Sequence, residues 1–348
     1  MSGKKQVFVI GGTGYIGASV LQRLVKHRTA AESEYTVLVR SEDKERKLAE
    51  LVKSGGLGDV GIKLVRGSNA DFDVLEAQAA RADVVFSMAD SDDVPAIKAV
   101  IAGLKKRYEQ TGVAPILIHT SGTGVLMDKA EGNFEGTNYY DDTIPEHLEA
   151  LADTQIHRPV DLLVVEADSQ GYLRSYIILP GVIFGIATGP LYDAGVGNRH
   201  SMAVPLLIKK GVSRGEVGVV GEGLSKWPAV HIDDTADLYI TLYDGVLSGR
   251  AGRGREGYYF AENGHYTWYS LSKAVAEALV ALGKSNNIEP TPFTKAEYEE
   301  SFMLRVLGTN ALCHANRGRA LGWKPKYTID DLYRSIKPEA EVLLSVSS

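Results

Sequence analysis

The residues best suited to chemistry are the glycines of a short turn near the start of the 348-residue chain. The turn reads Gly11-Gly12-Thr13-Gly14-Tyr15-Ile16-Gly17; it follows an apolar run and precedes a helical pattern. Gly11 can adopt a backbone conformation that a β-carbon forbids, Gly14 lets the main chain approach a pyrophosphate, and Gly17 lets the helix pack closely. The free amides and the dipole at the helix start attract phosphates. Strand, tight turn and helix together predict a dinucleotide site. Its expected contacts in the turn are Gly11, Thr13, Gly14, Tyr15, Ile16 and Gly17.

The end of the second candidate strand indicates which dinucleotide binds. Sites that prefer NAD usually carry Asp or Glu here, because a carboxylate can bind both ribose hydroxyls. This chain carries Arg40, and the guanidinium fork suits a 2′-phosphate. Lys44 and Arg46 lie within reach of the same loop, although a solvated basic loop without a ligand is the alternative. We therefore expect NADP rather than NAD, held in part by Arg40 and Lys44.

The elements that must position these residues alternate between short β-branched runs and longer helical patterns. Candidate strands lie at 6–10, 35–39, 62–65, 83–87, 115–119 and 175–179. Candidate helices lie at 18–26, 44–53, 94–108 and 159–169. Alternation at this spacing predicts right-handed crossovers and a parallel sheet that is covered on both faces.

The later part of the chain has a different pattern. Glycine and proline are dense over 185–223, and the stretch 227–247 is typical of a strand end that leads into a helix. Asp233 and Asp234 are placed to cap that helix. We predict an α/β protein whose Rossmann-type, doubly wound parallel sheet comprises residues 1–185 and 227–262. A smaller C-terminal substrate-binding lobe would comprise 186–226 and 263–348.

Composition narrows the class of protein. Apolar residues make up 44% of the chain and charged residues 24%, which is typical of a globular protein. The net charge of −6 disfavours nucleic acid as a partner. No run approaches the roughly 18 apolar residues of a membrane span, and the first apolar stretch is too short for a secretory signal. The single cysteine, Cys313, excludes an internal disulfide. We therefore expect a cytoplasmic protein.

These motifs resemble the extended and atypical short-chain dehydrogenases/reductases, including NmrA-like and epimerase-like proteins. The resemblance rests on the Gly-x-x-Gly-x-x-Gly turn and on five further segments: 37–41, 120–122, 179–182, 230–234 and 320–325. It implies that Asp71 lies near the adenine and that Met88 and Ala89 line the end of the fourth strand. It also implies a place beside the nicotinamide for Pro180, Gly181 and Val182.

The catalytic centre departs from this family. Its reductases carry Tyr-x-x-x-Lys on the helix after the fifth strand, where the tyrosine donates a proton and the lysine lowers its pKa. Only Tyr269/Lys273 and Tyr333/Lys337 have this spacing, and both pairs fall late in the chain. At the expected place, His157 stands at the tyrosine position and Asp161 at the lysine position.

Two interpretations of this pair remain open. In the first, Asp161 orients His157, which passes protons near neutral pH. In the second, both residues only start a helix, with Pro159 in its first turn and Asp161 near its positive end.

Other candidates follow the fifth strand and the later loops. Ser121 is our choice for the hydroxyl that binds substrate. The loop Tyr139-Tyr140-Asp141-Asp142 could supply a replacement phenol. His231, Asp233 and Asp234 suit a structural role between strand and helix better than a chemical one. The spacing of His and Cys residues predicts no metal site.

The leading hypothesis is an NADP(H)-dependent oxidoreductase that acts on a small organic carbonyl, imine or iminium compound. Without a tyrosine acid, an imine is easier to accept, because its nitrogen is already basic. Two alternatives are an isomerase or cyclase that keeps the cofactor without net redox, and an NmrA-like regulator that binds dinucleotide without turnover. Helices on the sheet faces could also pair two copies into a homodimer.

Overall fold

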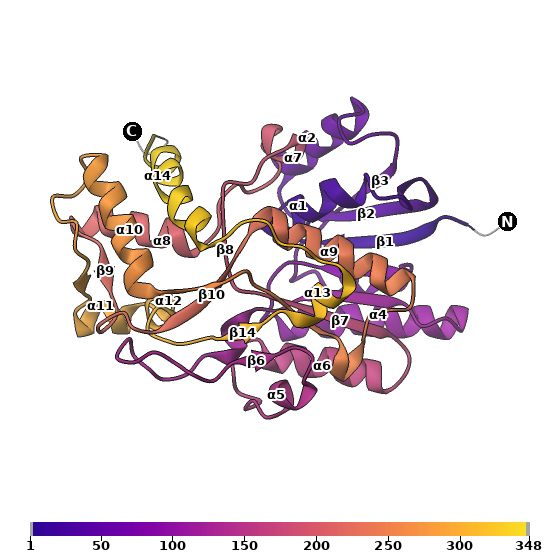
Figure 1. The fold of residues 1–348 in the computed structure, drawn as a ribbon. Coiled ribbons are helices and arrows are strands. Elements are labelled where there is room, and N and C mark those ends of the chain that lie inside the picture. Colours follow the sequence, from indigo (N-terminus) through magenta and orange to yellow (C-terminus); the bar gives the residue numbers. More distant parts are fainter. Residues whose placement is uncertain (1–2, 346–348) are drawn as a thin grey trace.

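The computed structural model describes residues 3–345 and centres on a seven-stranded sheet (Figure 1). The strand order is β11-β7-β5-β4-β1-β2-β3, and each neighbouring pair is parallel. The strands are β1 (Lys5–Ile10), β2 (Ser33–Val39), β3 (Gly61–Arg66), β4 (Val84–Ser87), β5 (Ile116–Thr120), β7 (Arg174–Pro180) and β11 (Tyr258–Ala261). This arrangement confirms the predicted Rossmann-like α/β fold.

The central strands are buried on both faces, which explains their nearly continuous apolar sequences. Every residue of β4 and β5 is buried, and β4 pairs with β1 from Val7↔Val84 to Ile10↔Ser87. A parallel strand covered by helices on both sides has no polar face. The six predicted strands therefore coincide with observed strands, with ends that differ by one or two residues.

Two helical layers cover the sheet. Helices α3 (Phe72–Ala79), α4 (Val94–Thr111) and α6 (Arg158–Ser169) pack side by side on one face. On the other face α1 (Tyr15–Leu24) packs against α9 (Ile232–Leu247), while α1 and α2 (Glu42–Lys53) both contact α7 (Pro190–Asp193). Shorter helical pieces on this part of the chain are η1 (Ala30–Glu32), η2 (Thr123–Leu126), α5 (Pro145–Glu149) and η3 (Gly254–Glu256).

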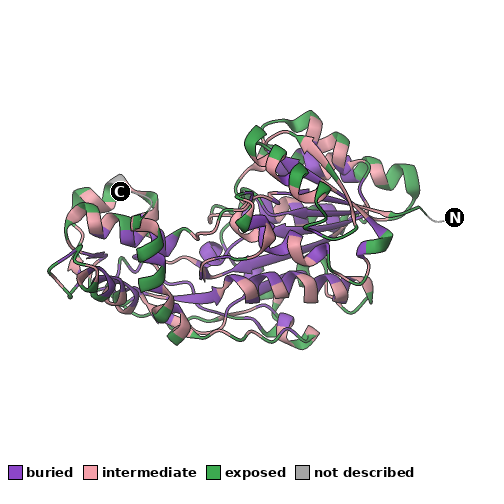
Figure 2. Cartoon of the chain, turned by 90° about the horizontal axis from the view of Figure 1, so that it is seen from above, coloured by how far each residue is buried: buried purple, intermediate pink, exposed green. Residues whose placement is uncertain are grey.

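The second part of the molecule holds the C-terminus and packs helices around small sheets (Figures 1 and 2). Helix α10 (Trp268–Ala281) lies against α8 (Ala203–Arg214) and α14 (Ile329–Ser345), and α11 (Lys295–Glu300), α12 (Phe302–Val306) and α13 (Asn316–Leu321) complete the helices. The small sheets are β12-β10-β8, β13-β9 and β14-β6. Their strands are β6 (Tyr140–Asp141), β8 (Val182–Phe184), β9 (Gly218–Val219), β10 (Lys226–His231), β12 (His265–Thr267), β13 (Thr291–Pro292) and β14 (Cys313–His314).

The two parts are interleaved along the chain. Strand β8 leaves the end of the central sheet and pairs with β10, and α13 returns to pack against α9 and β11. In Figure 2 the buried residues follow the sheet and the inner sides of the helices, whereas exposed residues lie outside. The predicted domain boundaries stay a prediction. No helix in residues 3–345 is both long and apolar enough to cross a membrane.

Candidate functional site

The glycine turn between β1 and α1 has the backbone geometry that its sequence predicts. Gly11 has a φ of +81°, and a β-carbon there would lie 2.5 Å from the carbonyl oxygen of Met88. A β-carbon on Gly17 would lie 2.0 Å from the carbonyl oxygen of Gly11. The Gly14 amide donates to the Gly11 carbonyl over 2.9 Å, and α1 then begins without a side-chain cap. These contacts leave a cradle that only glycines can form at the start of a helix, where phosphates bind.

The side chain of Tyr15 joins this turn to the second part of the molecule. Its hydroxyl donates to the carbonyl oxygen of Gly185, just after β8, and its own carbonyl accepts from the Tyr192 hydroxyl over 2.7 Å. Burial raises the pKa of Tyr15 well above its ordinary value. The Tyr15 hydroxyl therefore serves as a structural donor to Gly185.

Two cations without acidic partners lie beside the turn. Arg40 is exposed at the end of β2, and Lys44 donates to the carbonyl oxygen of Thr13 over 3.1 Å. Burial, and then the charge of Arg40, lower the pKa of Lys44. Within residues 3–345 neither forms an ion pair, whereas Arg46 is bound to Asp43 and Glu50 on its own helix. Arg46, which the sequence places within reach of the same loop, therefore already has two carboxylate partners.

The other residues expected at the cofactor line the same edge of the sheet. Met88 and Ala89 lie against Gly11, and Ala89 also lines a small cavity between β1, β4 and α4. The Asp71 carboxylate accepts from the Ser68 amide and hydroxyl, both over 2.7 Å. Pro180 ends β7, Val182 begins β8, and the Gly181 amide between them donates to Ala261.

Ser121 and Asp161 form a buried pair where β5 ends and α6 begins. The Ser121 hydroxyl donates to Asp161 Oδ2 over 2.9 Å, and the two residues are 5% and 0% exposed. Asp161 Oδ1 has no hydrogen-bond partner among the described residues. Burial raises the pKa of Asp161 to about 7, although Ser121, His157 and Arg158 oppose the shift. Near neutral pH this carboxyl can therefore hold or release a proton.

His157 is bound to a different carboxylate from the one expected. Its backbone amide donates to Asp92 Oδ1 over 2.8 Å, and its ring Nδ1 lies 3.0 Å from the same oxygen. The Ser91 hydroxyl lies 3.0 Å from Nδ1 as well. His157 also has a φ of +67°, a conformation that is uncommon for a residue other than glycine. In the structure, Asp161 is therefore hydrogen-bonded to Ser121, whereas His157 is hydrogen-bonded to Asp92. His157 and Asp161 do not form one hydrogen-bonded unit.

Two polar residues near this cluster were missed from sequence. Asp92 follows β4 in the run Asp90-Ser91-Asp92-Asp93, so its place at a strand's carboxyl end was an available signal. His119 on β5 is buried with both ring nitrogens unpartnered among the described residues, and burial lowers its pKa to about 3. Nothing in its sequence context distinguishes it from its apolar neighbours.

The other tyrosine candidates are engaged elsewhere. Tyr139 stacks on His314, with ring centroids 4.8 Å apart, and Tyr140 pairs with Cys313 between β6 and β14. Tyr269 and Lys273 on α10 both bind Glu289. Tyr333, on α14, contacts the hydroxyl of Ser270 on α10. None of these contacts joins a tyrosine to the cluster around Ser121.

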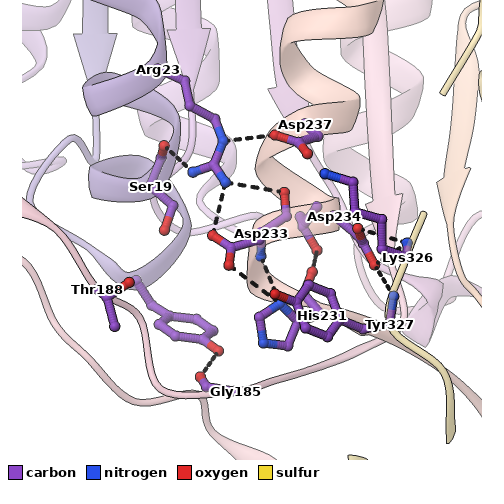
Figure 3. Close-up of polar contacts among 12 residues, drawn as sticks. Ser19, Arg23, Gly185, Thr188, His231, Asp233, Asp234, Asp237, Lys326 and Tyr327 are labelled. Atoms are coloured by element: carbon purple, nitrogen blue, oxygen red, sulfur yellow. Dashed lines mark hydrogen bonds and ion pairs between the residues drawn. The ribbon is translucent and has the colours of Figure 1, made fainter. Parts of the chain in front are cut away.

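The junction between β10 and α9 is structural (Figure 3). His231, rather than either aspartate, caps α9: its Nδ1 accepts from the Asp233 amide over 3.2 Å. The Asp233 carboxylate binds Arg23 of α1, and that of Asp234 accepts from the amides of Lys326 and Tyr327. The expectation that the aspartates cap the helix was wrong, because longer-range partners engage both carboxylates.

Comparisons with known proteins agree with this geometry. Residues 3–107 match the NmrA-like family. "Oxidase ucsJ" of Acremonium sp is 28% identical, over 97% of this chain and 99% of that protein. Anthocyanidin reductase of Arabidopsis thaliana is 32% identical over 37% of this chain and 42% of its own. The structure of dTDP-glucose 4,6-dehydratase from Bacillus anthracis with NAD superposes with a TM-score of 0.63 at 14% identity, covering 97% of each chain. Residues 3–107 thus match the NmrA-like family, as the sequence predicts, and the chain as a whole has the fold of this dehydratase.

Proposed function

We propose that this protein is an NADP(H)-dependent oxidoreductase that acts on a small organic carbonyl or imine compound. One observation carries the proposal: a buried Ser121–Asp161 pair lies at the carboxyl edge of a sheet whose first turn is built for a dinucleotide. Ligands of open α/β sheets bind outside the carboxyl ends of the strands. A Ser121–Asp161 pair that can hold a proton, at the same sheet edge as the glycine turn, supports reduction or oxidation as the reaction.

The residues present fit the cofactor. The turn has a tight backbone path that β-carbons at Gly11 or Gly17 would prevent by colliding with main-chain atoms, and the start of α1 offers amides without a side-chain cap. Among residues 3–345, Arg40 and Lys44 form no ion pair, and a 2′-phosphate would compensate both charges. These features support NADP over NAD. When bound there, NADPH supplies a hydride to the substrate carbon.

The Ser121 hydroxyl is the group that would contact the substrate heteroatom. When Asp161 carries its proton, the same 2.9 Å contact lets the carboxyl donate to Ser121 Oγ. Ser121 then passes its own proton to the heteroatom, and Asp161 is left as a carboxylate. Because burial raises the pKa of Asp161 to about 7, the donor form is populated up to neutral pH.

An iminium substrate would use Asp161 differently. Its nitrogen is already positive, so the ionised carboxylate would stabilise the cation without transferring a proton. Both roles of Asp161, as a proton donor and as a carboxylate that stabilises a cation, require Ser121 and Asp161 at the reacting group. The first role needs the protonated carboxyl and the second needs the ionised one, so the two roles operate at different pH. The relatives named as an oxidase and a reductase support redox chemistry over a purely regulatory role.

The test is consumption of NADPH and NADH by the purified chain with a panel of ketones, aldehydes and cyclic imines. We expect NADPH to be oxidised in proportion to product, with NADH a poorer donor. Conversion without loss of NADPH would instead indicate an isomerase or cyclase. Tight dinucleotide binding without any conversion would indicate a regulator. The cytoplasmic location, the absence of nucleic-acid and membrane partners, and a homodimeric state stay predictions.

A further inference from the structure

We propose that Asp92 is a positioning residue that holds the imidazole of His157 with its proton on Nδ1. Nε2 is then a hydrogen-bond acceptor beside the loop that follows Ser121. We infer that this acceptor selects substrates with a hydroxyl or amino group on the carbon next to the reacting one. The inference rests on the proposed function and adds a substrate class to it.

The tautomer follows from the partners of the ring. Asp92 Oδ1 receives the His157 backbone amide over 2.8 Å and lies 3.0 Å from ring Nδ1. The Ser91 hydroxyl, also 3.0 Å from Nδ1, can donate or accept a hydrogen bond. An ionised carboxylate only accepts, so the contact with Asp92 requires a proton on Nδ1. The hydrogen bond from His157 also lowers the pKa of Asp92 and keeps it ionised. A neutral imidazole with its proton on Nδ1 presents a bare lone pair at Nε2.

The place of Nε2 follows from the glycines opposite it. A β-carbon on Gly122 or on Gly124 would lie 3.0 Å from Nε2, so the ring edge lies over the loop that follows Ser121. Within residues 3–345 no group is hydrogen-bonded to Nε2, and the His157 side chain is 14% exposed. The atom thus keeps an unused lone pair, which can accept a hydrogen bond from a ligand that reaches this loop.

The backbone conformation of His157 indicates that surrounding contacts hold its ring in this position. The residue keeps a φ of +67° while its amide is bound to Asp92, and α6 begins directly after it. Such conformations persist only where the surroundings over-determine them, and they cluster at functional sites. Asp92 is itself held, because its amide donates to Asp90 Oδ1 over 2.9 Å.

One donor, Ser121 Oγ, and one acceptor, Nε2, at the same loop would match a substrate with two polar groups. Ser121 Oγ donates to the reacting oxygen or nitrogen, and Nε2 accepts from a neighbouring O–H or N–H. A substrate that lacks the second group leaves a partly buried acceptor unpaired, which weakens its binding. The preference should therefore appear mainly in KM.

The experiment compares hydroxyacetone with butanone, which has a methyl group in place of the hydroxyl, together with the corresponding pair built on the best carbonyl substrate. In the parent protein kcat/KM should favour the hydroxyl compound about tenfold, the usual effect of one hydrogen bond. Asp92→Ala should remove that preference. His157→Asn should remove it too, because asparagine tolerates the positive φ and reaches Asp92 but lacks Nε2. Asp59→Ala, at an exposed site, is the control.

Nitrogen NMR of the histidine rings supplies a readout that needs no turnover. We expect a proton on Nδ1 of His157 in the parent protein and a shift toward Nε2–H in Asp92→Ala, with the signal assigned by its loss in His157→Asn. A parent tautomer with the proton on Nε2, or equal preference in parent and both variants, would overturn the inference. Failure to reduce any carbonyl or imine would overturn the proposed function instead, and the NMR result would still decide the role of Asp92.

Discussion

The glycine turn and the start of α6 present their polar groups in opposite ways. At the turn, the backbone is bare and two cations, Arg40 and Lys44, have no acidic partner in the described chain. At the start of α6, each chemical side chain already has a partner from another element: Ser121 for Asp161, and Asp92 for His157. The turn therefore presents amides and cations that suit an anionic ligand. At the start of α6, hydrogen bonds between side chains determine which atoms carry protons.

The difference is also one of solvation. Arg40 is exposed, so water stabilises its charge. Asp161 is fully buried, so its charged form is disfavoured and its pKa rises to about 7. Folding therefore favours the protonated carboxyl, and its contribution to stability falls as pH rises from about 4 to about 7. A buried carboxyl that costs stability at neutral pH is typical of a functional site.

The largest expected effect is at the turn itself. Gly14→Val should abolish binding of both NADP(H) and NAD(H), because its side chain would occupy the approach of the pyrophosphate at the start of α1. Isothermal calorimetry measures the loss. Gly61→Ala, where a β-carbon would meet nothing closer than 3.6 Å, is the control. Retained binding in Gly14→Val would mean that the cradle has been misassigned.

The next largest effect is at the buried pair. Asp161→Asn or Ser121→Ala should lower turnover by about 10²–10⁴-fold, the usual effect of losing a general acid, with cofactor affinity unchanged. The double variant should be no worse than either single one, because the two residues act as a unit. For ketone reduction by the parent protein, kcat should fall as pH rises above about 7, where Asp161 loses its proton.

Single-turnover rates and calorimetry on the same samples check this prediction, with the exposed Asp153→Asn as the control. Additive losses in the double variant would contradict a shared role. Full activity in all three variants would place the chemistry outside the pair.

A smaller effect is expected at Arg40. Arg40→Ala should weaken NADP binding roughly ten- to a hundredfold and leave NAD binding nearly unchanged, since a charge-assisted hydrogen bond contributes about 1.5–3 kcal/mol. Arg46→Ala is the matched control, because Arg46 is already bound to Asp43 and Glu50. Equal affinities of the parent protein for the two cofactors would refute the assignment of Arg40.

The smallest effect concerns stability alone. His231→Ala should lower the free energy of unfolding by about 1–2 kcal/mol, because it removes the cap of α9 and the stacking on Tyr327. His231→Asn should recover part of the loss, since asparagine is a good cap. Melting curves check both variants. A loss of activity per folded molecule would contradict a purely structural role.

The fold and the turn could be predicted from sequence because their signals are local. The six strands were found from short apolar runs, and Gly11 adopts the positive φ that its motif predicts. The partners at the start of α6 could not be found in this way. Ser121 and Asp161 are 40 residues apart, and Asp92 and His157 are 65 apart, so each contact depends on how the strands are ordered.

Two further details show that local spacing does not determine the partners of a charged side chain. Asp233 and Asp234 have the right local spacing to cap α9, but Arg23 and the amides of residues 326 and 327 engage them from other elements. Arg46 suits a phosphate loop by spacing, yet carboxylates one turn away on its own helix bind it first. Local spacing indicates which charged side chains lie near a helix start or a loop, but it does not indicate which partners the fold brings to them.

The most direct test of the central claim follows the hydride itself. The purified chain would be incubated with NADPH deuterated at the transferable position and with the best carbonyl or imine substrate, and the product analysed by mass spectrometry. The account predicts one deuterium on the former carbonyl or imine carbon for each NADPH oxidised, and strongly reduced transfer in Asp161→Asn. Product that forms without deuterium and without loss of NADPH would contradict it.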